Sequence, residues 1–347
     1  MKYQVAGYLI FPLIIGGCAN LLGERRPEAA VTSQEFSVID QSCLPLSLQF
    51  SYDECRVAPL VGFAVQEIAG GRFASACISL QKSRSVADNT ALAGLHIWCL
   101  LQDHNLSAAQ QLLNTAIAEF EVDQHLAYSG ALVHEQSGNH QLAHSLYSDL
   151  FALNGEPMIL EACARTALAS SQSQRCLDCL DQLLLATEVT PTHLTMRAAA
   201  FAQLRRYSES MALLVHMLED WPNDGELLLQ TAFVAYDYAA ASSSLELYVD
   251  AAILLRRITE LDPQNAAVFL PLARCYAASG DFNESTLAFM RCLELEPNNV
   301  AASHELSDLY MTYNDKSLAQ KILRQLLNQP ISPVARQQTT HKLSQLD

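Results

Sequence analysis

The sequence predicts an all-α protein built from helix hairpins that stack in one elongated array. Apolar residues recur at helical spacing through most of the 347 residues. The same pattern returns about every 34 residues, which is typical of repeat architectures. A composition of 50% hydrophobic and 17% charged residues allows a long continuous core. Because a lone helix hairpin cannot bury its apolar face, each copy of the pattern requires neighbours.

The clearest copy of the pattern runs from Ala266 to Asn299. Gly280 can adopt the positive φ that a tight turn between two helices requires, and Asp281 is a good N-cap for the second helix. Pro297 then ends that helix. Small side chains stand where the two helices would cross, because antiparallel helices approach closely only over small residues. These small residues are Ala273, Ser285 and Cys292.

The spacing within this copy resembles the tetratricopeptide repeat, a helix–turn–helix unit of 34 residues. The resemblance implies a right-handed superhelical solenoid of about eight hairpins plus a C-terminal capping helix. It also implies that the first helix of each hairpin lines the concave face. The matching motif positions are Phe269, Leu272, Ala273, Tyr276, Gly280, Phe282, Phe289 and Pro297.

Counting in both directions from this copy places the repeats within residues 57–331. Residues 332–347 are then expected to form the capping helix that a terminal repeat requires. The repeat that starts near Gly225 is about seven residues too long, and the extra residues fall within Ala239–Val249. They predict either two longer helices or a loop that would offer Leu245, Leu247 and Tyr248 to a partner. The repeats start near residues 57, 90, 124, 157, 191, 225, 266 and 300.

The N-terminal residues resemble the signal peptide of a bacterial lipoprotein. An apolar run, Val5–Ile15, is followed by two glycines and Cys18, as in a lipobox. Residues 1–17 would be removed and Cys18 acylated; an ordinary secretory signal or an uncleaved anchor is the alternative. Ala19 stands where Asp would imply inner-membrane retention, so the resemblance implies an outer-membrane lipoprotein facing the periplasm. Residues 18–56 lack a helical period and are typical of a spacer, with a short strand or a mobile tether as the options.

The charge and the motifs exclude several classes of function. A net charge of −16 disfavours nucleic acids and anionic lipid surfaces, which need a basic patch. No phosphate-binding loop, nucleophile elbow or dinucleotide fingerprint occurs, and the His-Glu pairs at His134 and His304 lack the second His of a zinc protease. We expect no enzymatic activity, no cofactor, no metal and no small-molecule substrate.

The chain contains ten cysteines, and export to an oxidising compartment would favour disulfides among them. Cys176 and Cys179 form a CxxC string that imitates a redox or zinc motif, but no second CxxC accompanies it, which favours a structural interpretation. Residues symmetric about a helix turn lie at the same height, and this rule supports two of three candidate pairs. The pairs are Cys77 with Cys99, Cys163 with Cys179, and, in the spacer, Cys43 with Cys55.

Function is expected on the face formed by the first helices. Aromatic and Arg side chains dominate interface energies, and two adjacent repeats carry such a cluster. Packing of the same side chains against neighbouring helices is the alternative. The Lys, Asn and Arg set of the family's carboxylate clamp is absent, so a C-terminal carboxylate ligand is not favoured. The candidate partner-binding residues are Tyr128, Leu132, Arg165, Leu229, Phe233, Tyr236, Leu270 and Arg274.

The chain after the spacer resembles envelope tetratricopeptide lipoproteins of Gram-negative bacteria, such as the TadD-like and pilotin-like proteins of pilus and secretion machines. The resemblance implies a scaffold that is tethered to the membrane by lipid on Cys18 and binds a protein or peptide segment in its groove. It would assist assembly of a pilus or secretion complex. A regulator of a periplasmic cell-wall enzyme is an alternative, and a thiol or metal protein acting through Cys176 and Cys179 is a third.

Overall fold

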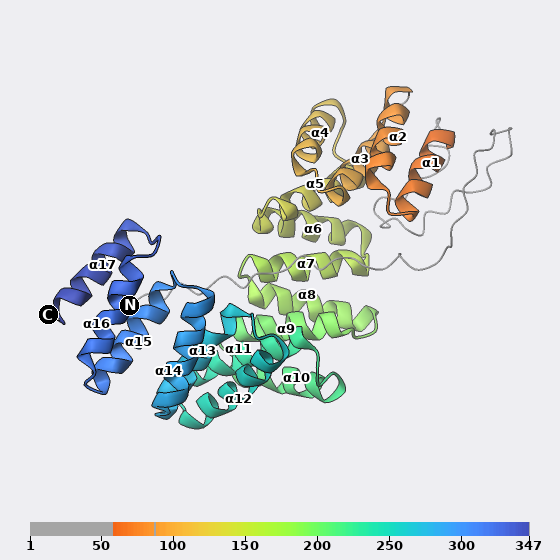
Figure 1. Ribbon diagram of the computed structural model, residues 1–347. Coiled ribbons are helices and arrows are strands. Elements are labelled where there is room, and N and C mark those ends of the chain that lie inside the picture. The colour runs from red at the N-terminus through yellow and green to blue at the C-terminus, as the bar shows by residue number, and fades with distance from the viewer. Residues whose placement is uncertain (1–57, 87, 347) are drawn as a thin grey trace. The chain divides into compact units, whose positions relative to one another are not determined.

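The computed structural model describes residues 58–86 and 88–346 and contains only α-helices in this part of the chain (Figure 1). The predicted all-α class is confirmed. The expected signal peptide, residues 1–17, the lipidated Cys18 and the spacer to residue 56, with Cys43 and Cys55, lie outside the described residues. None of the described helices combines the length and apolar character needed to cross a bilayer.

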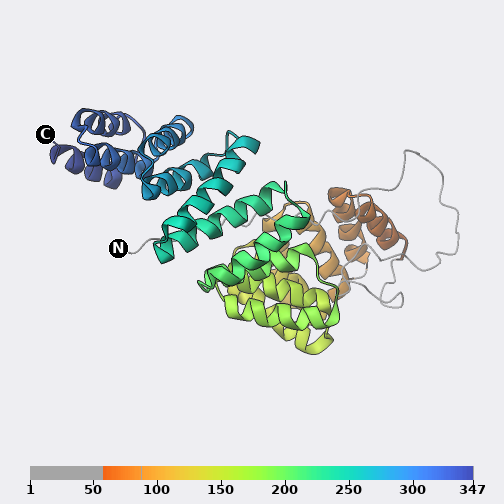
Figure 2. The same ribbon diagram turned by 90° about the horizontal axis from the view of Figure 1, so that it is seen from below.

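The chain divides into two compact units, unit 1, which ends at residue 188 and of which residues 58–86 and 88–188 are described, and unit 2, described over residues 189–346. The sequence register predicted a single array and shows no sign of this division, because the 34-residue spacing continues across residue 188. Within each unit the hairpins follow one another in chain order (Figures 1 and 2).

Unit 1 consists of four helix hairpins, in which consecutive helices pack against each other. Its helices are α1 (Ala58–Ala69), α2 (Phe73–Val86), α3 (Thr90–Gln102), α4 (Leu106–Glu119), α5 (Gln124–Gln136), α6 (His140–Asn154), α7 (Pro157–Ala169) and α8 (Ser173–Ala186).

Unit 2 consists of four further hairpins and a final single helix, α17, that packs on α16. Its helices are α9 (Pro191–Gln203), α10 (Tyr207–Asp220), α11 (Gly225–Ser242), α12 (Leu245–Leu261), α13 (Ala266–Ser279), α14 (Phe282–Leu295), α15 (Val300–Thr312), α16 (Lys316–Leu327) and α17 (Pro333–Ser344).

The helix starts follow the repeat register closely. Each first helix from α3 to α15 begins at the residue where the register starts a repeat, and α1 begins one residue after its expected start. The extra residues Ala239–Val249 are helical apart from the short turn at Ser243, so the loop interpretation was wrong and the helix-extension interpretation is confirmed. The hairpin of α11 and α12 is therefore longer than its neighbours, with helices of 18 and 17 residues.

Polar N-cap side chains explain where most helices begin. The first backbone N–H groups of a helix have no partner inside the helix, and a side-chain oxygen at the N-cap accepts a hydrogen bond from one of them. Ten caps of this kind occur in the described residues: Asn89, Asn105, Asp123, Thr190, Asp224, Ser244, Asp281, Asn299, Asp315 and Ser332.

The turn inside every hairpin contains a residue with positive φ. Gly280 has φ 80°, as the sequence predicted, and other hairpins place glycine at the equivalent position. The remaining hairpins hold a non-glycine residue there, a conformation that costs an L-residue about 1–2 kcal/mol. The glycines are Gly71, Gly138 and Gly280, and the other turn residues are His104, Ser171, Arg205, Ser243 and Asn314.

Small residues stand at the helix crossings, and in two hairpins a serine there also forms a hydrogen bond between the two helices. The hydroxyl of Ser285 on α14 donates a 2.9 Å hydrogen bond to the carbonyl of Ala273 on α13. Ser210 donates a matching 2.7 Å bond to Ala198 in the hairpin of α9 and α10. Cys176 is fully buried at the equivalent crossing in unit 1. The serines predicted only as small residues therefore also link the two helices directly.

Candidate functional site

Five candidate residues lie on the first helices of two adjacent hairpins in unit 2. Leu229, Phe233 and Tyr236 are spaced four and three residues apart on α11, so they share one side of that helix. Leu270 and Arg274 share one side of α13. All five side chains are half-buried, and we refer to these residues together as the unit 2 face.

The apolar side chains of the unit 2 face are only partly buried in the core. Leu229, Tyr236 and Leu270 pack against the large buried cluster of unit 2. The ring of Tyr236 also meets Tyr248 of α12 edge-on, with 6.4 Å between centroids. One side of each of these residues thus packs on a neighbouring helix, as the alternative interpretation expected, and the other side remains accessible. Their role in binding a partner stays a prediction.

Arg274 connects three successive first helices. Its guanidinium donates two hydrogen bonds to the carboxylate of Glu305 on α15, at 2.8 and 2.6 Å, and one at 3.4 Å to the hydroxyl of Tyr236 on α11. Hydrogen bonding to Glu305 raises the pKa of Arg274. Glu305 was not predicted as a partner of Arg274, although the separation of 31 residues between them, close to one repeat, was an available signal.

The capping helix α17 contributes to the same side of unit 2. Lys342 of α17 donates a 2.7 Å hydrogen bond to the carboxylate of Asp308 and another to the carbonyl of His304, both on α15. Nε2 of His304 lies 2.9 Å from the hydroxyl of Thr339 on α17. Burial, and then the charge of Lys342, lower the pKa of His304. α17 is therefore linked to α15 by polar contacts, in addition to its packing on α16.

The candidates in unit 1 are more enclosed than the sequence predicted. Tyr128 of α5 is only 6% exposed and packs edge-on against Tyr147, with 6.0 Å between ring centroids. Burial raises the pKa of Tyr128 to about 12. The expectation that Tyr128 is open to a partner is therefore corrected, because its ring fills the core between α5 and α6. Leu132 is half-buried and packs against two buried clusters.

Arg165 of α7 forms an ion pair like that of Arg274. Its guanidinium donates hydrogen bonds of 2.6 and 3.2 Å to the carboxylate of Glu135 on α5, which also accepts one of 3.0 Å from the Tyr147 hydroxyl. Burial alone would lower the pKa of Arg165, but the hydrogen bonds and charge of Glu135 outweigh it and raise the pKa. Both candidate arginines thus link first helices of neighbouring hairpins.

The cysteine pairs lie in helices that pack together. The thiol of Cys163 is hydrogen-bonded to Cys179, and that of Cys77 to Cys99. None of these four cysteines forms a disulfide in this structure, so the two disulfides stay a prediction. Cys176 of the CxxC string is buried apart from this pairing, and burial raises its pKa to about 12. In residues 58–86 and 88–346, no group of three or more His, Cys, Asp or Glu side chains is placed to hold a metal ion.

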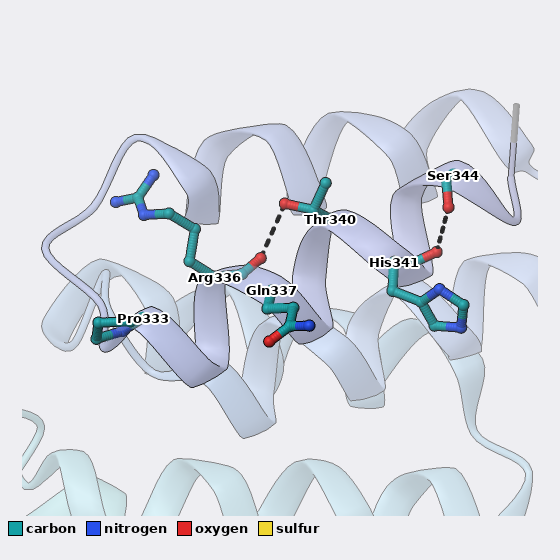
Figure 3. Close-up of a pocket in the computed structure, with 6 residues that line it drawn as sticks. All are labelled: Pro333, Arg336, Gln337, Thr340, His341 and Ser344. Carbon is teal, nitrogen blue, oxygen red and sulfur yellow. Dashed lines mark hydrogen bonds between the residues drawn. The ribbon is translucent and has the colours of Figure 1, made fainter.

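A shallow depression runs along the outer side of α17, and it does not form a binding site with opposing walls (Figure 3). All the residues that line it belong to this one helix. Thr340 and Ser344 donate their hydroxyl hydrogens to carbonyls of the same helix, at Arg336 and His341. This polar surface is what a solvated cap at the end of a repeat array requires.

No protein-family model matches the chain. A curated relative, the tetratricopeptide repeat-containing protein trd-1 of Caenorhabditis elegans, is 24% identical over 148 residues, a match that covers 37% of this chain and 19% of the relative. The chain thus spans about a fifth of that relative's length.

Two solved structures share the architecture. A tetratricopeptide repeat protein from Parabacteroides merdae superposes with a TM-score of 0.51 at 16% identity, over 73% of this chain and 98% of that chain. The C-terminal part of a repeat-containing protein from Cytophaga hutchinsonii gives a TM-score of 0.52 at 14% identity, over 70% and 97%. At this identity the likeness establishes the fold and not the function. The chain has the fold of the tetratricopeptide repeat proteins.

Proposed function

We propose that the protein is an interaction scaffold that binds a protein or peptide segment on the unit 2 face. The supporting observation is the cluster of half-buried apolar side chains, Leu229, Phe233, Tyr236 and Leu270, on two adjacent first helices. Aromatic side chains that are rigidly held but still accessible are the residues that contribute most to interface energies. Arg274 holds the hydroxyl of Tyr236 and so orients one of them.

The electrostatics of the face favour a partner segment with apolar or aromatic side chains over one that presents a carboxylate. The charge of Arg274 is already balanced by Glu305 through two hydrogen bonds. A ligand carboxylate would have to displace Glu305 and leave that half-buried charge without its partner, which is costly. An apolar segment would instead cover the accessible sides of Phe233 and Tyr236 and leave the ion pair intact.

We also propose a location for the protein in the cell. The apolar run before Cys18 supports attachment to the envelope through lipid on that residue, at an outer membrane and facing the periplasm. The partner would then be a component of a pilus or secretion complex; a cell-wall enzyme is the alternative. Labelling with a lipid precursor, with and without Cys18→Ala, tests the attachment independently of the partner.

Site-specific photocrosslinking tests the unit 2 face. A photoreactive phenylalanine analogue at Phe233 should trap a defined partner in the native cell. The matched control places the same analogue at Ile253, an exposed residue on the second helix α12 of the same hairpin. The identity of the trapped protein separates a pilus or secretion component from a cell-wall enzyme.

The proposal requires the crosslink at position 233 to exceed that at position 253 and to weaken when Tyr236→Ala is added. Circular dichroism of each variant establishes that the helices are intact. Equal crosslinking at the two positions, or a crosslink that Tyr236→Ala leaves unchanged, would contradict the assignment of the binding surface.

A further inference from the structure

A polar depression lies between α6 and α8 of unit 1, remote in sequence from the unit 2 face. Its volume is about 380 Å³. α6 contributes His144 and Asp149 to its lining, and α8 contributes Arg175, Asp178 and Cys179. Cys179 is half-buried, whereas the other cysteines of the described residues are buried. A thiol that opens into a polar depression is placed where a small molecule can reach it.

A second thiol, that of Cys163, belongs to the buried cluster against which Cys179 packs. Cys163 of α7 is 1% exposed and hydrogen-bonds to Cys179 through its own thiol. Nδ1 of His144 donates a 3.0 Å hydrogen bond to the backbone carbonyl of Cys163. Helix α7 packs against both α6 and α8, so the buried thiol of Cys163 belongs to the helix that contacts both walls of the depression.

The groups around Cys179 favour its thiolate. The hydrogen bond from Cys163 lowers the pKa of Cys179, burial opposes this, and the charges of Asp178 and Arg175 act in opposite directions. The same hydrogen bond raises the pKa of Cys163. Burial lowers the pKa of His144, which disfavours a positive charge on this residue beside the pair. The accessible sulfur is thus the nucleophile of the pair, because the thiolate is the reactive form.

We propose that Cys179 and Cys163 form a redox-active dithiol that undergoes exchange with low-molecular-weight disulfides entering this depression. The Cys179 thiolate attacks one sulfur of the small disulfide, forming a mixed disulfide and releasing one small thiolate. The Cys163 thiol then loses its proton and attacks the Cys179 sulfur, which releases the second small thiolate. The protein loses two electrons and two protons to the small disulfide, which leaves as two thiols.

The pair Cys77 and Cys99 provides an internal comparison. These thiols are also hydrogen-bonded to each other, and that bond lowers the pKa of Cys77 to about 6. Both residues are nevertheless buried. If reactivity followed the pKa alone, Cys77 would react first; if access to the depression decides, Cys179 reacts first. Comparing the reaction rates of the two pairs therefore shows whether reactivity depends on the depression at Cys179 or is shared by all paired thiols.

Oxidised glutathione is a suitable probe, used on the reduced full chain with peptide mass spectrometry. We expect a disulfide between Cys163 and Cys179 with release of two molecules of reduced glutathione, and native-state alkylation of Cys179 at least about tenfold faster than that of Cys77 or Cys176. Cys163→Ser should stop at a glutathione adduct on Cys179. Cys179→Ser should leave Cys163 unmodified, and Cys176→Ser should behave as the wild type.

Faster reaction of Cys77, or oxidation of the pair only at urea concentrations that unfold the chain, would overturn the proposal. So would a folded Cys163→Ser variant that forms no adduct. The alkylation rates of the wild-type protein test the proposal without any substitution. The proposal therefore remains falsifiable even if a variant misfolds.

Discussion

One substitution, glycine to alanine, is expected to have three different outcomes at three positions. Gly130 lies within α5, and a Cβ there would meet only the methyl groups of Leu113, at 3.8 and 3.9 Å. Gly94 lies within α3, and its Cβ would meet the Ser129 hydroxyl at 3.0 Å and the His125 carbonyl at 3.1 Å. Gly280 has φ 80° with open space around it.

The magnitudes follow from these surroundings. Gly130→Ala should stabilise by about 0.5–1 kcal/mol, because alanine loses less chain entropy in a helix and the space accommodates a methyl group. Gly280→Ala should destabilise by about 1 kcal/mol, since the cost of positive φ exceeds the entropic gain. Gly94→Ala should destabilise by about 2 kcal/mol, because a backbone carbonyl of α5 must move and the contact between α3 and α5 opens.

Equilibrium urea unfolding followed by circular dichroism measures the order, and hydrogen exchange of each helix locates the change within its own unit. The expected order of stability, from highest to lowest, is Gly130→Ala, the wild type, Gly280→Ala and Gly94→Ala. If Gly94→Ala matched Gly130→Ala, the close approach of α3 and α5 would be absent. If Gly280→Ala were stabilising, the turn would not have the conformation described.

Three further predictions concern single contacts. Ser285→Ala should cost about 1 kcal/mol in urea unfolding by removing the hydrogen bond to Ala273; unchanged stability would show that this bond contributes nothing. Arg165→Met should cost about 2 kcal/mol, a value reduced from that of a fully buried pair because the arginine side chain is 32% exposed, and adding Glu135→Gln should restore part of it. Burial lowers the pKa of His144 from its ordinary value of 6.5, so at a pH below 6.5 the unfolded chain binds more protons than the folded chain. The free energy of unfolding should therefore fall from pH 7 towards pH 5. His144→Gln should flatten that slope in urea titrations, and an equal slope would contradict this.

The register of the hairpins could be predicted from the sequence because close helix crossings admit only small residues. Ala273 and Ser285 recur in equivalents such as Ala198 and Ser210, and this repetition allowed the helix starts to be predicted. Local preference explained less at the turns. Arg205 has φ 60°, although nothing in its chemistry favours this, because the two helices it joins determine the path of the chain.

The candidate site was harder to predict because it depends on contacts between repeats. The period gives the spacing along the chain but not the rotation of one hairpin against the next, so the carboxylates of Glu135 and Glu305 were missed as partners of Arg165 and Arg274. The burial of Tyr128 has the same origin, since its ring packs against Tyr147 of the following helix. The aromatic residues of the unit 2 face could be grouped in advance because the repeat register places them on one side of α11, and their role in binding stays a prediction.

The lengthened hairpin of α11 and α12 affects how a partner could find its place. Hairpins of equal length present nearly the same surface again and again, so a binding segment could slide by one repeat and still make similar contacts. The longer pair reduces this ambiguity, because helices of 18 and 17 residues occur once among the described hairpins and place Leu245 and Val249, 56% and 44% exposed, on the added length. A partner could therefore distinguish this hairpin from the others, and the same hairpin carries Phe233 and Tyr236.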